Sequence, residues 1–141
     1  MRFMMMVKAD KNYEAGIPPK PELLAAMGKL TAEMVKAGVL VQTGGLLPSS
    51  SGARVHVSRG QLSITDGPFA ETKELIGGYA IVEAASRDEA IQIGRRFMEL
   101  HASVLGQSYE GACEVRQLFD GPGCSAAHEN DSRTESTVVS N

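Results

Sequence analysis

The order of helical and strand-like segments constrains this fold more than any other feature of the sequence. A first helix is predicted from Pro21 to the capping Gly38, because apolar residues recur there at helical spacing. A second helix begins at a capping box, Ser86 to Glu89, and carries an apolar stripe that includes Phe97. Strand-like apolar runs precede, separate and follow the helices, at 2–8, 39–41, 55–65, 79–82 and 113–119.

The resulting order is strand, helix, strand, hairpin, strand, helix, strand. It predicts an α+β fold of ferredoxin-like type, an antiparallel sheet with two helices on one face. The run 78–82 is apolar at both odd and even positions, which is typical of a strand buried on both faces. Because two helices can cover only one face, we expect a homodimer in which two sheets meet.

The hairpin has the clearest local signature. Arg59-Gly60 is a turn pair, and the flanking residues alternate between apolar and polar, which predicts one covered face. Its apolar positions are Val55, Val57, Leu62 and Ile64. The preceding Gly44-Gly45 and the segment 48–52 are predicted to form a loose connection.

Composition and charge exclude several classes of function. The chain has 14 basic and 17 acidic residues, a net charge of −3 and no basic stripe, so we expect no nucleic-acid binding. The opening apolar run, 3–7, is far too short to span a bilayer. Cys113 lies in an apolar strand pattern and Cys124 in a polar tail, so we expect no disulfide between them. We therefore expect a cytoplasmic location. Metal-ligand spacing and a glycine-rich βαβ fingerprint are both missing, so we expect no metal and no cofactor.

The last 21 residues differ in composition from the rest. Segment 121–141 lacks aromatic residues and is rich in Ser, Thr and acidic residues. A segment of this kind buries too little apolar surface to offset the entropy lost on ordering. We therefore expect one folded domain, residues 1–120, followed by a disordered tail.

A charge-rich turn lies between the hairpin and the next strand. The nine residues 66–74 read Asp-Gly-Pro-Phe-Ala-Glu-Thr-Lys-Glu. Proline removes a backbone donor and aspartate disfavours strands, so the chain must leave the sheet here. Asp66 can serve as a general base at the mouth of a cleft, or its side chain can cap its own turn. Both interpretations stay open at this point.

This turn resembles the signature of the DGPF proteins, a branch of the YCII-related family. The resemblance continues through 75–79 and includes the opening Met1-Arg2-Phe3-Met4 and the closing Glu114-Val115-Arg116, so it covers 1–120. It implies a dimeric α+β barrel, in which two ferredoxin-like sheets pair around a cleft. It also implies relatives that use a His/Asp pair in proton transfer, including halide removal from a chlorinated ring, and an association with extracytoplasmic-function sigma factors.

Further candidate site residues each have a functional and a structural interpretation. His101 can pair with Asp66 in the cleft, or interact with the carbonyls at the end of its own helix. Lys73 can hold an anionic substrate or belong to a solvated turn. Arg116 can clamp an anion in the cleft or form an ion pair with Glu114 across the dimer. Two more candidates complete the set of substrate contacts: Tyr79, otherwise a core residue, and His56, otherwise a solvated cross-strand partner.

Two functions follow from these candidates. The first is a cofactor-independent enzyme that performs proton transfer, elimination or isomerisation on a small anionic organic molecule. In it Asp66 is the base, His101 its acid partner, and Lys73 or Arg116 the anion anchor. The second is a non-catalytic ligand-binding or regulatory module that works with a sigma factor, and in it the signature turn is structural.

Overall fold

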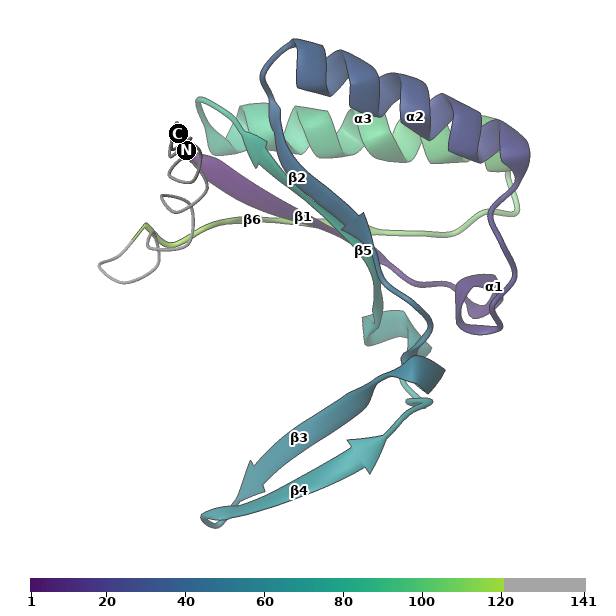
Figure 1. The fold of residues 1–141 in the computed structure, drawn as a ribbon. Helices are drawn as coiled ribbons and strands as arrows, with labels where there is room; N and C mark the ends of the chain where they lie inside the picture. The colour runs from purple at the N-terminus through teal and green to yellow at the C-terminus, as the bar shows by residue number, and fades with distance from the viewer. Residues whose placement is uncertain (121–141) are drawn as a thin grey trace, which may run out of the picture.

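The structure is a computed structural model and describes residues 1–120. The predicted tail, 121–141, lies outside the described residues. A four-stranded antiparallel sheet in the order β2-β5-β1-β6 forms one layer, and two long helices lie side by side across one of its faces (Figure 1). These elements are β1 (Arg2–Lys8), α2 (Pro21–Lys36), β2 (Leu40–Gly45), β5 (Ile76–Glu83), α3 (Arg87–Leu105) and β6 (Cys113–Gln117). The predicted α+β fold of ferredoxin-like type is confirmed.

The core lies between the sheet and the helices. Phe3 and Met5 of β1 face Val82 of β5 in this layer, each at most 2% exposed. Ala90 of α3 is fully buried against them. Gly94, one turn further along α3, allows close packing on β6, because a Cβ atom there would lie 3.1 Å from Val115 Cγ2. The even-numbered positions of β5 and the odd-numbered positions of β1 therefore face the helices.

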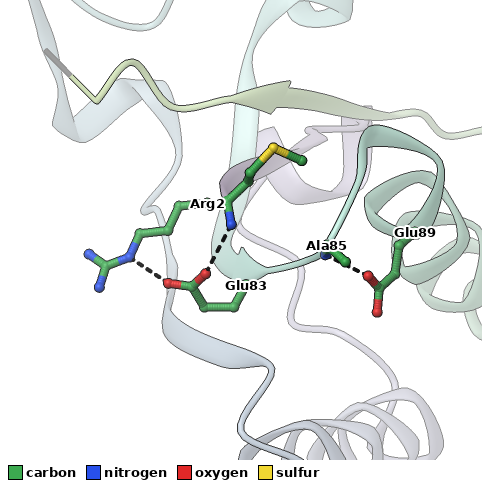
Figure 2. A network of polar contacts seen from close by, with 5 residues as sticks. Arg2, Glu83, Ala85 and Glu89 are labelled. Carbon is green, nitrogen blue, oxygen red and sulfur yellow. Dashed lines mark hydrogen bonds and ion pairs between the residues drawn. The ribbon is translucent and has the colours of Figure 1, made fainter.

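The predicted capping box at the start of α3 forms with one difference. The Ser86 hydroxyl accepts a hydrogen bond from the Glu89 N–H at 3.1 Å. The Glu89 carboxylate accepts from the N–H of Ala85, at 2.5 Å, rather than from that of Ser86 (Figure 2). The two bonds satisfy backbone donors that have no partner within the helix.

A second polar cluster joins the start of β1 to the end of β5. Glu83 accepts from Arg2 Nε at 2.8 Å, and its other oxygen lies 3.5 Å from the Met1 ammonium group (Figure 2). The hydrogen bond from Arg2 lowers the pKa of Glu83 below its usual value. These contacts hold the register of the two central strands at the end where the sheet meets α3.

The second strand is longer than the sequence predicted. Gly44 and Gly45 do not form a loop but belong to β2, where they pair with Tyr79 and Gly78. The Tyr79 ring explains why position 44 is glycine, because a Cβ atom there would lie 3.0 Å from Tyr79 Cε1. Glycine in a strand often marks such a close approach.

The predicted hairpin forms, but it does not join the main sheet. β3 (Ala53–Ser58) and β4 (Gln61–Asp66) pair with each other and project away from the sheet (Figure 1). Arg59 and Gly60 have φ values of 51° and 76°, as a type I′ turn requires. Among residues 1–120, nothing covers the apolar face predicted for this hairpin, because its four apolar residues are 68–73% exposed.

Three short helices complete the described structure. α1 (Lys11–Glu14) follows β1, whereas η1 (Ser49–Ser51) and η2 (Thr72–Glu74) flank the hairpin. Among residues 1–120, none of the helices has the length and apolar character needed to cross a membrane.

Candidate functional site

The signature segment 66–74 begins at the base of the hairpin. Gly67 donates its N–H to the carbonyl of Gly52 at 2.8 Å. A Cβ atom at this position would lie 1.7 Å from the Ser49 carbonyl oxygen and 2.6 Å from its carbon. Only glycine therefore fits between the end of β4 and η1.

Ser49 and Glu14 hold the segment from the other side. The N–H and hydroxyl groups of Ser49 donate to the two carboxylate oxygens of Glu14, at 2.9 and 2.5 Å. The same hydroxyl accepts from the N–H of Phe69 at 3.1 Å. This clamp, formed by Glu14, Ser49 and Phe69, connects α1, η1 and the signature segment, and it engages polar groups that a ligand would otherwise find free.

The Phe69 ring contacts the hairpin. The Arg54 guanidinium of β3 lies 3.9 Å from its centroid, in cation–π geometry. Arg54 Nη1 also lies 3.3 Å from Glu71 Oε2. The polar face of the hairpin is thus attached to the signature segment near its base.

Asp66, the last residue of β4, is exposed and pairs with Ala53 through the backbone. Within residues 1–120, its carboxylate makes no hydrogen bond to its own turn or to His101. Its roles as general base or turn cap both remain predictions.

His101 lies in the helical layer, on the buried stripe of α3 as predicted. It is 7% exposed, and its Nδ1 donates to the Phe97 carbonyl one turn earlier, at 2.9 Å. Its ring lies 4.5 Å from the Phe97 ring and 5.9 Å from the Tyr109 ring, centroid to centroid. Burial raises the pKa of Tyr109, as it does that of the half-buried Cys113 nearby. Within one protomer, His101 is therefore a packed residue with an aromatic neighbour on each side.

Tyr79 and Arg116 lie instead on the sheet face opposite α2 and α3, which no helix of residues 1–120 covers. Strand register places the outward-facing side chains of this open face in two rows across the four strands. One row is Gln42, Ile81, Met4 and Arg116, and the next is Gly44, Tyr79, Met6 and Glu114. Both rows have apolar or aromatic groups at the centre and polar groups at an edge.

Hydrogen bonds and charges on the open face favour an anion. Gln42 Nε2 donates to the Tyr79 hydroxyl at 3.1 Å, and this leaves the hydroxyl proton able to donate elsewhere. At the β6 edge, the Glu114 carboxylate lies 3.4 Å from Lys8 Nζ and 3.9 Å from Arg116 Nε. One carboxylate thus faces two cations, and the Arg116 side chain is 72% exposed. Arg116 and Glu114 thus pair within one protomer, and a positive charge is left over beside them. An ion pair between these residues across a dimer stays a prediction.

The other predicted contacts lie elsewhere. Lys73 is exposed in η2, and His56 is exposed on the polar face of the hairpin, opposite Ser63. Within a protomer, the predicted residues thus fall into separate groups rather than one site. The open face brings together two of them, Tyr79 and Arg116.

Sequence reasoning missed the floor of the open face, made by Met4, Met6 and Ile81. The sequence contained the information, because successive side chains of a strand point to opposite faces of the sheet. The residues of β1 and β5 between the helix-facing positions must therefore line the open face. Gln42 could not be found in this way, because the register of β2 shifts between Leu40 and Gln42.

Two hollows lie away from these residues. One of about 110 Å³ lies between α2 and α3, with Glu33 and Arg96 at its rim. The other, about 340 Å³ and open, lies between α3 and β6, with Arg87 and Arg95 among its lining residues. Neither includes a predicted site residue, and the described residues contain no cluster of three potential metal ligands.

Comparison with known proteins adds a family. Residues 1–106 match the model of the YCII-related domain. A protein of Rhizobium meliloti (strain 1021), named Uncharacterized protein R00369, is 37% identical over 84 residues, which are 60% of this chain and 63% of that protein's length.

A solved structure is similar at lower identity. It is 5-chloro-2-hydroxyhydroquinone dehydrochlorinase (TftG) from Burkholderia phenoliruptrix AC1100, in complex with 2,5-dihydroxybenzoquinone. The alignment has 18% identity and a TM-score of 0.41, over 86% of this chain and 96% of that one. Nothing about the activity of that enzyme transfers to this chain at such a distance.

Proposed function

We propose, for a chain that belongs to the YCII-related family, that the open face of the sheet binds a small anionic organic molecule. The observation that carries this proposal is the arrangement of Tyr79 and Arg116 at opposite sides of an apolar floor. Such a surface suits a planar molecule with a carboxylate at one end, because the floor takes the ring and the guanidinium takes the charge. A second copy of the chain covering this face would turn the surface into a cleft.

Binding can be tested with benzoate and its hydroxylated derivatives as probes. We expect these ligands to raise the melting temperature of the full chain and to shift the amide resonances of β1, β5 and β6. Arg116→Gln should weaken benzoate binding about tenfold, the usual effect of removing a charge-assisted hydrogen bond. Arg95→Gln is the matched control, because Arg95 is a paired arginine in the helical layer.

Two results would contradict the proposal. One is a set of probes that leaves both the melting temperature and the open-face resonances unchanged. The other is a loss of affinity in Arg95→Gln but not in Arg116→Gln, which would move the ligand to the hollow between α3 and β6.

The catalytic form of this proposal uses Asp66 as general base for a cofactor-independent proton transfer, elimination or isomerisation. Its exposed carboxylate has no hydrogen bond among the described residues, so the group is free to accept a proton. His101 remains its candidate acid partner only between protomers, because Phe97 and Tyr109 flank it within its own. Lys73 and His56 are the further candidate contacts to the anion.

Catalysis has its own experiment, deuterium exchange followed by NMR, with phenylpyruvate as the probe because, unlike benzoate, it has an acidic C–H bond beside a carbonyl group. We expect exchange above the buffer rate with the unmodified protein and none with Asp66→Asn. The melting temperature should stay within about 2 °C, since the substitution breaks no hydrogen bond of the described structure. A large drop in melting temperature, without any exchange by the unmodified protein, would instead assign Asp66 to the turn.

A second candidate is the non-catalytic ligand-binding or regulatory module, with the sigma-factor association that the family resemblance suggests. The Glu14–Ser49–Phe69 clamp favours it, because the signature segment uses its polar groups to hold the fold. Ligand binding without exchange or turnover in the same assays would select this candidate.

A further inference from the structure

The β3–β4 hairpin has one face formed by four aliphatic side chains, with Ala53 and Asp66 at its base. Val55 lies directly opposite Ile64, and Val57 directly opposite Leu62. These four side chains are 68–73% exposed. The opposite face carries the polar residues Arg54, His56, Ser63 and Thr65. An alternation of this kind is typical of a ribbon with one covered face.

Nothing in the described part of the chain covers this apolar face. The hairpin pairs only with itself there, and Figure 1 shows it projecting away from the sheet and both long helices. Its attachments are at the base and on the polar side, through Gly67 to Gly52 and Arg54 to Phe69. A two-stranded ribbon alone is marginally stable in water. Residues 1–120 thus provide no surface that stabilises this hairpin on its apolar side.

We propose that the aliphatic face of the hairpin docks on a second copy of this chain, so that two hairpins act as arms that clasp a dimer. The one ionisable side chain on this face, Asp66, lies beside Ala53 at the base of the hairpin, so docking of the four aliphatic side chains nearer the tip would bury no charge. In a two-fold symmetric dimer the same contact forms twice, once through the arm of each protomer. This proposal does not depend on a ligand or on catalysis.

The area of the arms argues for a second copy rather than a small segment. Burying a Val, Leu or Ile side chain removes on the order of 100 Å² from water. Eight such side chains from two arms supply about 800 Å², half of the roughly 1,600 Å² of a standard interface. The open sheet face, with Met4, Met6 and Ile81, is an apolar surface without a partner among the described residues and can supply the remainder. A dimer that uses both surfaces reaches the size of a stable interface.

The test is the oligomeric state of the full chain, measured by analytical ultracentrifugation over a range of concentrations. We expect a species of twice the chain mass of 15.0 kDa. Val57→Asp should raise the dimer dissociation constant roughly 100-fold or more, because an unpaired carboxylate would be buried at both symmetric contacts. Ser63→Asp is the matched control: it adds the same charge on the opposite face of the same hairpin and should change the constant by less than about threefold.

A second variant distinguishes loss of the dimer contact from unfolding of the hairpin. Val57→Thr keeps a β-branched side chain and strand propensity but places a hydroxyl in the contact, and should raise the dissociation constant about tenfold. Equal effects of Val57→Asp and Ser63→Asp would overturn the proposal, and so would a monomer at all concentrations. If Met4→Lys dissociates the dimer whereas both Val57 variants leave it intact, the dimer forms through the sheet face alone and the arms are not part of it. Failure of benzoate to bind would count against the proposed function and leave this result unaffected.

Discussion

The strongest test of the signature segment is Gly67→Ala. A methyl group at this position would lie 1.7 Å from the Ser49 carbonyl oxygen, so one of the two backbones must move by more than an ångström. Forced shifts of this kind cost about 1–3 kcal/mol. The movement also breaks the hydrogen bond from Gly67 to Gly52 or that from Phe69 to Ser49, at about 1 kcal/mol each. We therefore expect the free energy of unfolding to fall by about 2–4 kcal/mol.

Urea denaturation followed by circular dichroism measures this change, and the melting temperature should drop by roughly 10 °C. Gly45→Ala is the matched control, because a Cβ atom there has no neighbour within 4 Å and the backbone of β2 suits alanine. It should be neutral or stabilise by up to about 1 kcal/mol. Hydrogen exchange at Phe69 and Gly67 distinguishes global destabilisation from local opening of the segment.

Equal stability of Gly67→Ala and Gly45→Ala, with the amides at positions 67 and 69 still protected from hydrogen exchange, would contradict the predicted clash with Ser49. That result would mean that η1 and the signature segment can move apart without lowering the free energy of unfolding. The clamp between Ser49 and Glu14 would then have no part in holding the hairpin base.

Three further outcomes are expected. Ser49→Ala should lower stability by about 1–2 kcal/mol, since it leaves Glu14 with one hydrogen bond fewer, and Ser49→Thr should restore most of the loss in urea denaturation. Because Arg2 lowers the pKa of Glu83, this carboxylate stabilises the fold fully above the usual glutamate pKa of about 4.3, and the contribution disappears as the pH falls through the lower folded pKa. Glu83→Gln should remove that part of the acid dependence, and an unchanged titration of stability would contradict the assignment. Burial raises the pKa of Cys113, so it should react with iodoacetamide at pH 8 more slowly than cysteine in an unfolded peptide, and equal rates would show that the thiol is open to solvent.

Local patterns predicted the elements, and long-range contacts decided the rest. The helical stripe with Ala90 and Gly94, and the turn at Arg59-Gly60, follow from spacing within one element. Gly44-Gly45 was wrong as a loop, because both glycines belong to β2, and the ring that favours glycine at position 44 is that of Tyr79, 35 positions further along the chain. Likewise, alternation revealed the apolar face of the hairpin but carries no information on which surface covers it.

The candidate site was only partly accessible from the sequence. Spacing on a helix correctly placed His101 on the buried stripe with Phe97, but the second partner of its ring, Tyr109, comes from the segment that follows α3. The family signature drew attention to 66–74, where the structure shows a clamp. The better-formed surface, on the open face around Tyr79, is assembled from four strands distributed over the whole domain, and no short motif marks it.

The position of β1 has a consequence for synthesis of the chain. It is made early, yet it lies between β5 and β6, and about 70 residues separate its end from the start of β5. At 5–20 residues per second, its Phe3 and Met5 wait roughly 4–14 s for their first strand partner. The later α2 is the first element able to shelter them. Substitutions that weaken α2 should therefore reduce the yield of folded protein in cells more than they reduce the equilibrium stability of the finished domain.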